Sequence, residues 1–226
     1  MPKIRAALFD LDGTLLDTAP DLALAANAMR VHYGMAPLRE DVITSFVGKG
    51  MENLVRRSLA GALEPAEPPK VPIADALAVF KAHYHRVNGD RARIFEGVAD
   101  GLRELADLGI RLAVVTNKPT EFVGPLLTQT GLRGFFEVLV CGDTCERKKP
   151  DPMPVQHACA QLGLKPNQVV LVGDSVNDAQ AGKAAGTPVL IVPYGYNEGR
   201  DVAHLEVDAL VRDVAEVVSW LQQRPA

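Results

Sequence analysis

Two carboxylates follow the first apolar segment of the chain. Leu8 and Phe9 end that segment, and Asp10, Asp12 and Gly13 come directly after it. Because side chains in an extended strand alternate with a period of two, acids separated by one residue at a strand end project toward the same side. Gly13 permits a sharp turn out of the strand. Taken alone, the pattern fits a polar turn or a helix cap as well as a site for chemistry.

Polar residues also follow two later apolar segments. Thr116 and Asn117 come after residues 111–115, and Asp174 comes soon after residues 168–172 in a Gly-Asp-Ser stretch. The carboxyl ends of parallel strands lie along one edge of a sheet, where open α/β folds bind their ligands. If these segments are strands of one parallel sheet, their polar residues meet the first two carboxylates at that edge.

Three of these side chains, those of Asp10, Asp12 and Asp174, are acidic. Their convergence would build up a costly cluster of negative charge unless a divalent cation neutralised it. Oxygen ligands, with room left for water and a phosphate oxygen, favour Mg²⁺ over zinc or copper. The sequence therefore predicts Mg²⁺ as a cofactor at a site for an anionic substrate.

A basic turn offers the positive charge that such a site needs. Lys149 ends the run Arg147-Lys148-Lys149 and is followed by Pro150 and Pro152. The prolines stiffen this connection and allow a lysine to be held in one direction. Most basic turns are simply solvated. Here the nearby acids change the interpretation, because a phosphate site needs a fixed positive charge beside its metal.

Six short apolar segments have the length and the Val, Leu and Ile content of buried strands in a parallel sheet. They are Ile4–Phe9, Arg111–Val115, Glu137–Cys141, Gln168–Val172, Pro188–Val192 and Ala209–Val211. From Gly97 onward the strands alternate with helical patterns, which is typical of a doubly wound α/β fold. The helices expected there cover residues 98–108, 152–162, 176–185 and 214–221.

The chain between the first two strands has a different character. Apolar residues recur there at intervals of three and four, without an evident strand, in Ala19–Tyr33, Met51–Leu59 and Ile73–Val87. We predict an all-helical insertion of residues 18–91 and an α/β core built from residues 1–17 and 92–226. The insertion is expected over the carboxyl edge of the sheet, because it leaves directly after the first strand.

Composition excludes several classes of protein. The chain has 226 residues, of which 47% are apolar and 23% charged, and its net charge is −4. No apolar stretch is long enough to span a membrane, and the basic residues are dispersed rather than gathered into a nucleic-acid footprint. We therefore expect neither a membrane nor a nucleic acid as a partner.

The cysteines and the N-terminal segment indicate the compartment. Cys141, Cys145 and Cys159 are odd in number and lack the paired spacing of a metal site, so free thiols are expected. The first residues show no pattern of a secretion signal. A cytoplasmic protein is the resulting expectation, and the sequence does not determine its oligomeric state.

Four stretches of the chain, in this order, resemble the motifs of the haloacid dehalogenase superfamily. Residues 10–14 are similar to its first motif, Thr116-Asn117 to its second, Lys149-Pro150 to its third and residues 173–178 to its fourth. The resemblance covers nearly the whole chain. Residues 18–91 resemble the small mobile cap of this family, which closes over the active site and helps to select the substrate, and we call them the cap.

The resemblance implies a role for each motif residue. Asp10 would be the nucleophile that accepts a phosphoryl group, and Asp12 would be the general acid and base. The side chains of Asp10 and Asp174, with the backbone oxygen of Asp12, would bind Mg²⁺. The phosphoryl oxygens would be bound by Thr116, the backbone of Asn117 and Lys149. The protein would then be a phosphatase that forms an aspartyl-phosphate intermediate.

Asp178 has two interpretations. Ser175 and Asp178 are spaced as in a capping box at the start of a helix. Asp178 also adjoins the expected metal site, where it would orient a metal ligand or Lys149 without touching the substrate. Thr18 and Asp21 show a similar capping pattern, and there we expect only a structural role.

Within the superfamily the chain looks most like the phosphoglycolate phosphatases, through residues 46–50 in the cap and residues 194–197. Two glycines in the first stretch would let a cap loop approach a small ligand. Lys49 or Arg56 would then bind the carboxylate of 2-phosphoglycolate. For Lys49, an exposed turn is an equally good interpretation. The expected substrate is a small phosphate monoester, with 2-phosphoglycolate as the first choice.

Other activities stay open. Asp12 favours phosphate esters, because dehalogenases and phosphonoacetaldehyde hydrolases lack a matching acid. A pyrophosphatase, a sugar-phosphate phosphatase and a β-phosphoglucomutase-like enzyme share the same core and differ mainly in the cap. A regulatory protein that binds phosphate without turnover is a further alternative, which the intact set of Asp10, Asp12, Lys149 and Asp174 disfavours.

Overall fold

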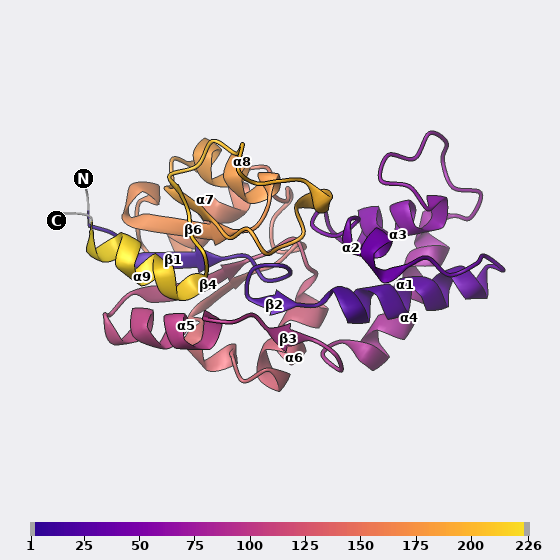
Figure 1. Cartoon of the computed structure of the whole chain (residues 1–226), viewed down its shortest axis with the longest axis horizontal. Helices are drawn as coiled ribbons and strands as arrows, with labels where there is room; N and C mark the ends of the chain where they lie inside the picture. Colours follow the sequence, from indigo (N-terminus) through magenta and orange to yellow (C-terminus); the bar gives the residue numbers. More distant parts are fainter. Residues whose placement is uncertain (1–2, 224–226) are drawn as a thin grey trace.

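A six-stranded parallel sheet forms the centre of the computed structural model, which describes residues 3–223 (Figure 1). Its strands are β1 (Ala6–Phe9), β4 (Arg111–Val115), β5 (Val138–Val140), β6 (Val169–Gly173), β7 (Val189–Ile191) and β8 (Ala209–Leu210). All six predicted strands are confirmed, with ends that differ from the prediction by at most two residues. The predicted doubly wound α/β class is confirmed with them.

The strand order β5-β4-β1-β6-β7-β8 places the first strand in the interior of the sheet. Phe9 of β1 lies opposite Val114 of β4 on one side and Val172 of β6 on the other. The chain extends the sheet on one side of β1 as far as β5, and then crosses back to start the other side at β6. Ligand crevices form at such a reversal, outside the carboxyl ends of the strands.

Helices cover both faces of the sheet (Figure 1). They are α5 (Val98–Asp107), α6 (Thr120–Gln129), α7 (Met153–Gln161), α8 (Val176–Ala185) and α9 (Val214–Gln222). Ala7 and Phe9 of β1 pack with α5, α6 and α9, whereas Ala6 and Leu8 pack with α7 and α8. The alternation of side chains along one strand thus fills two apolar layers. No helix in residues 3–223 is both long and apolar enough to cross a bilayer.

The cap is a separate group of helices beside the sheet (Figure 1). It consists of α1 (Ala19–His32), α2 (Glu40–Thr44), α3 (Met51–Ala60) and α4 (Ile73–Val87). Apolar side chains of all four helices form a second core, which also contains Phe122 of α6 and Tyr196 from the loop after β7. The cap therefore packs directly on the part of the molecule that carries the strand ends.

A two-stranded antiparallel ribbon connects the cap to the sheet. It consists of β2 (Leu16–Asp17) and β3 (Arg93–Ile94), with Asp17 opposite Arg93. Both crossings between the sheet and the cap lie side by side in this ribbon. The division of the chain at 17/18 and 91/92, which falls within two residues of this pair, stays a prediction.

Among the α-helices and strands, the short α2, the two-stranded ribbon and α6 were not predicted. Strands of two residues and a helix of five are too short to give a periodic pattern. α6 contains Pro125, which removes a backbone donor and argues against a helix interior. The helix forms because its apolar side chains are fully buried against the sheet and the cap, which outweighs local propensity. These side chains are Phe122, Val123, Leu126 and Leu127.

Candidate active site

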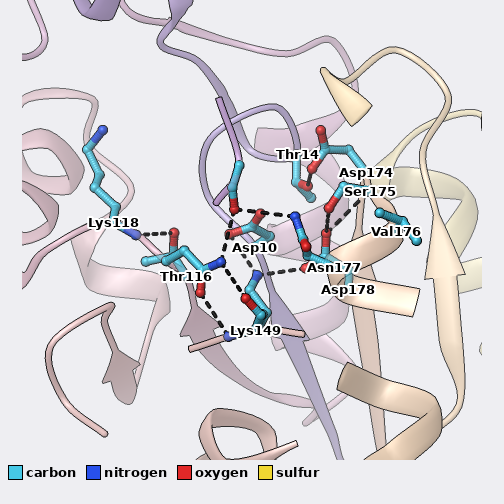
Figure 2. Close-up of polar contacts among 12 residues, drawn as sticks. Asp10, Thr14, Thr116, Lys118, Lys149, Asp174, Ser175, Val176, Asn177 and Asp178 are labelled. Atoms are coloured by element: carbon cyan, nitrogen blue, oxygen red, sulfur yellow. Dashed lines mark hydrogen bonds and ion pairs between the residues drawn. The ribbon is translucent and has the colours of Figure 1, made fainter. Parts of the chain in front are cut away.

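Side chains from three strand ends and one loop converge at the carboxyl edge of the sheet (Figure 2). Asp10 follows β1, Thr116 follows β4 and Asp174 follows β6. Lys149 reaches the same place from the connection between β5 and α7. The structure thus brings together the residues that the sequence singled out from four distant parts of the chain.

Asp10 continues β1 by one residue, because its backbone N–H donates to Val172 O at 2.9 Å. Its side chain is buried, and Lys149 Nζ lies 3.0 Å from Oδ1. That contact has the distance of an ion pair without the geometry of a hydrogen bond, so Oδ1 is a buried oxygen with no hydrogen-bond partner. Burial raises the pKa of Asp10 to about 6, which Lys149 opposes and Asp178 reinforces. This oxygen is therefore suited to bind a cation or to attack an electrophile.

The Asp174 carboxylate is held from both sides. Thr14 Oγ1 donates to Oδ1 at 3.2 Å, and the backbone N–H of Tyr196 donates to Oδ2 at 2.6 Å. The chain approaches so closely that a Cβ on Gly13 or Gly195 would overlap this side chain. Burial, with the charges of Asp178 and Asp10, raises the pKa of Asp174 well above its usual value. The carboxylate is thus fixed in place while its negative charge is poorly compensated.

Lys149 is a buried cation between two carboxylates. Its Nζ donates to Asp178 Oδ1 at 2.6 Å and faces Asp10 on the other side. Asp178 Oδ2 accepts hydrogen bonds from N and Oγ of Ser175 at the start of α8, so both contacts expected of Asp178 are present. Burial disfavours the charged ammonium, but Asp10 and Asp178 outweigh this effect and raise the pKa of Lys149. The lysine therefore stays charged at neutral pH.

Three carboxylates form a group that fits a divalent cation. Asp10, Asp174 and Asp178 each offer one oxygen, and these oxygens lie within 4.8 Å of one another. All three residues are buried and offer only oxygen donors, and one oxygen of Asp10 has no hydrogen-bond partner. The group therefore suits a hard ion such as Mg²⁺. The carboxylate of Asp12 lies outside this group, as expected if Asp12 offers only its backbone oxygen.

The Asp12 side chain faces the cap side of the site instead. Its Oδ1 accepts hydrogen bonds from Thr18 Oγ1 at 2.6 Å and from Lys118 Nζ at 2.9 Å. Both donors end on the same oxygen, which leaves Oδ2 to exchange a proton with a substrate. Thr18 is the N-cap residue of α1, as the capping pattern predicted, but the hydrogen bond of that pattern is absent. The side chain of Thr18 makes no capping hydrogen bond to α1, and Asp21 accepts from the backbone of Gly89 instead.

The side chain of Asn117 connects the end of β4 to the lysine loop and to the cap. Its Nδ2 donates to the backbone oxygens of Lys149 and Gly48, both at 2.9 Å, and its Oδ1 accepts from Lys149 N at 3.0 Å. Thr116 Oγ1 accepts from the backbone of Lys118 at 3.2 Å. Binding of phosphoryl oxygens by Thr116 and by the Asn117 backbone stays a prediction.

Lys118 is a buried residue of the site that our sequence interpretation missed. Besides Asp12, its Nζ donates to Tyr84 Oη of α4 at 2.6 Å and lies 4.9 Å from the centroid of that ring. Burial opposes its charge, but Asp12 and Tyr84 outweigh this and raise the pKa of Lys118. Its position three residues after the end of β4 was the available signal. Nothing in the sequence indicated that a cap helix would bury it.

The two cap cations expected to bind the substrate point elsewhere. Lys49 Nζ lies 2.7 Å from Glu198 Oε1, in an ion pair shared with the buried Arg57 at 2.6 Å. Arg56 pairs with Glu52 one turn away on α3, and its side chain is 40% exposed. Neither Lys49 nor Arg56 lines the cavity above Asp10. Their assignment to the substrate carboxylate is therefore not supported by this arrangement, because other carboxylates already engage both side chains.

A small cavity lies between the nucleophile and the cap. Its volume is about 40 Å³, enough for roughly three water molecules. The sheet side carries Asp10, Asp12 and residues 116–119, and the cap side carries two glycines and four apolar side chains. The apolar residues are Leu22, Val47, Met51 and Leu54. The side of the cavity toward the sheet is therefore polar and charged, and the side toward the cap, which we call the roof, is apolar.

The buried carboxylates make stability depend on pH and on metal. The pKa of Asp10 is raised from 3.8 to about 6. The stabilisation that protonated Asp10 gives the metal-free protein is therefore fully present below pH 3.8 and is lost as the pH rises through about 6. A bound divalent cation removes this loss of about 3 kcal/mol. About half of this loss lies between pH 5 and pH 8, so we expect Mg²⁺ to raise Tm by roughly 3–6 °C more at pH 8 than at pH 5. Thermal unfolding in Mg²⁺ and in chelator measures this, and an equal effect at both pH values would contradict it.

Comparison with known proteins gives a consistent result. Residues 7–192 match the family model described as haloacid dehalogenase-like hydrolase. A phosphoglycolate phosphatase of Nitrosospira multiformis is 48% identical over 97% of this chain and 96% of its own length. A phosphoglycolate phosphatase of Thiobacillus denitrificans is 45% identical over 94% and 93% of the two chains.

Solved structures agree with these relatives. The structure of a predicted phosphoglycolate phosphatase from Haemophilus somnus superimposes with a TM-score of 0.88 at 33% identity, covering 97% of this chain and 99% of the other. CbbY from Rhodobacter sphaeroides, in complex with phosphate, gives a TM-score of 0.79 at 29% identity over 95% and 96%. With its four motifs gathered at one sheet edge, the chain belongs to the haloacid dehalogenase-like hydrolase family.

Proposed function

We propose that the chain is a Mg²⁺-dependent phosphatase whose main substrate is 2-phosphoglycolate. One observation carries the proposal: Asp10 lines a small cavity and has a buried oxygen without a hydrogen-bond partner, and the Lys149 ammonium lies 3.0 Å from that oxygen. Phosphatase activity follows from the family and from relatives named phosphoglycolate phosphatase. Those names support the narrower choice of substrate.

The reaction has two steps that use the same two acids. Asp10 attacks phosphorus, the bond from phosphorus to the substrate oxygen breaks, and Oδ2 of Asp12 donates a proton to the leaving glycolate oxygen. Water then attacks the aspartyl-phosphate, Asp12 takes its proton, and phosphate leaves. Lys149 balances charge on the phosphoryl oxygens throughout. Mg²⁺, when bound by Asp10, Asp174 and the Asp12 backbone oxygen, would neutralise the phosphoryl charge and keep Asp10 ionised.

A substrate panel tests the proposal. We expect kcat/KM for 2-phosphoglycolate to exceed that for hexose phosphates, nucleotides and pyrophosphate by about 10² or more, because larger groups require a larger displacement of the apolar cap side of the cavity. Chelation should abolish turnover and Mg²⁺ should restore it. Equal values of kcat/KM across the panel would contradict the assignment of 2-phosphoglycolate as the main substrate. A preference for sugar phosphates would identify a sugar-phosphate phosphatase instead. Absence of Mg²⁺-dependent release of phosphate from every compound would instead favour a binding protein.

A further inference from the structure

One buried ammonium lines the cavity on the side away from the nucleophile. Lys118 is the only lysine or arginine among the lining residues that the structure describes. Its side chain is buried and extends away from Asp10 (Figure 2), so that Nζ reaches Asp12 and Tyr84 of α4. A small substrate with its phosphoryl group at Asp10 would therefore direct its other end toward this ammonium.

The ammonium keeps a free donor for a ligand. A lysine has three N–H groups, and the described contacts use two, toward Asp12 Oδ1 and Tyr84 Oη. The roof above it is apolar, so a substrate anion placed there would have to be paired with a cation. Lys118 is the lining residue whose charge can provide this pairing.

The start of α3 adds partial positive charge to the same cavity. Gly50 is the N-cap residue and Met51 the first residue of this ten-residue helix, and both line the cavity. No side chain caps the helix, so its first N–H groups are left to face an anion. A carboxylate between Lys118 and this helix end would meet positive charge from the core and from the cap.

We infer that Lys118 binds the carboxylate of the substrate and thereby selects a phosphorylated hydroxy acid over phosphate esters of uncharged alcohols. The inference rests on the proposed function and names the residue that gives it specificity. It replaces the expectation for Lys49 and Arg56, whose charged groups pair with Glu198 and Glu52.

Paired substrates test the inference. 2-Phosphoglycolate has a carboxylate where ethyl phosphate has a methyl group. The ratio of kcat/KM for 2-phosphoglycolate to kcat/KM for ethyl phosphate therefore measures how well the protein recognises the carboxylate. In the Lys118→Met variant we expect this ratio to fall by roughly 10- to 100-fold, the value of one charge-assisted hydrogen bond. The loss should be mainly in KM for 2-phosphoglycolate. Lys81→Met, which changes an exposed lysine one turn before Tyr84 on α4, serves as the matched control with an unchanged ratio.

Each alternative gives a different result. If Lys118 only positions Asp12, both substrates lose activity equally and the ratio stays constant, which overturns the inference. If Lys49 binds the carboxylate, the ratio falls in Lys49→Met and not in Lys118→Met, which also overturns it. If the proposed function itself is wrong, the wild-type protein will not prefer 2-phosphoglycolate over ethyl phosphate. This result differs from a wild-type preference that the Lys118→Met variant retains.

Discussion

Asp10→Asn is expected to lower the turnover of 2-phosphoglycolate by about 10⁵-fold or more, since an amide cannot accept the phosphoryl group. The Asn side chain has nearly the same shape, so the geometry around Lys149 should persist. Single-turnover labelling with substrate carrying radioactive phosphorus should give an acyl phosphate in the wild-type protein, identified by its cleavage with hydroxylamine. The variant should give no such label.

Asp10→Asn is expected to stabilise the protein although it abolishes activity. A stability measurement therefore shows whether the inactive variant is folded. Ionisation of the buried Asp10 is unfavourable without metal, as the pKa of about 6 indicates. The neutral amide introduced by Asp10→Asn should therefore stabilise the metal-free protein at pH 8 by up to about 3 kcal/mol. Denaturant unfolding in chelator measures this difference. An inactive variant that is also less stable would point to misfolding, and residual labelling would identify a different nucleophile.

Lys149→Met is expected to impair both stability and catalysis. It leaves Asp178, whose carboxylate is fully buried, without its ammonium partner. Breaking such a pair costs about 3–5 kcal/mol of unfolding free energy. Loss of the charge that balances the phosphoryl oxygens should also lower kcat by about 10³-fold. Unfolding in chelator and steady-state kinetics with Mg²⁺ measure the two effects.

The neighbouring lysine offers a matched control for this experiment. Lys148 is exposed, so Lys148→Met should change the unfolding free energy by less than about 0.5 kcal/mol. Adding Asp178→Asn to Lys149→Met removes the uncompensated carboxylate and should recover part of the lost stability. Additive effects in this double-mutant cycle, without an interaction energy of about 1 kcal/mol or more, would show that the two residues are not a functional pair.

The residues at strand ends could be predicted because local sequence determines their positions. The residue that follows a parallel strand lies at the carboxyl edge of the sheet, independently of how distant segments pack. This rule places Asp10, Thr116 and Asp174. Lys149 required one more assumption, that a proline-stiffened loop points inward. The family motifs supported that assumption, and the structure shows the lysine between Asp10 and Asp178.

The cap side of the site could not be predicted in the same way. The contact between Tyr84 and Lys118 depends on how a cap helix packs against the core, and no periodicity in either segment encodes that packing. The ion pair of Lys49 escaped prediction for a related reason, since its partner Glu198 lies far away in the loop after β7. Pairings between distant segments are set by tertiary structure, so cap residues that select a substrate need coordinates.

The interior position of β1 has a consequence for synthesis of the protein. Phe9 pairs with Val114 and Val172, so the first strand made has both of its neighbours far downstream. At about 5–20 residues per second, a ribosome leaves it without its first partner for roughly 5–20 s. During that time a short apolar segment with unpaired edges is exposed on the nascent chain. We therefore expect the yield of folded protein to depend on protection of this segment by a chaperone at the exit tunnel.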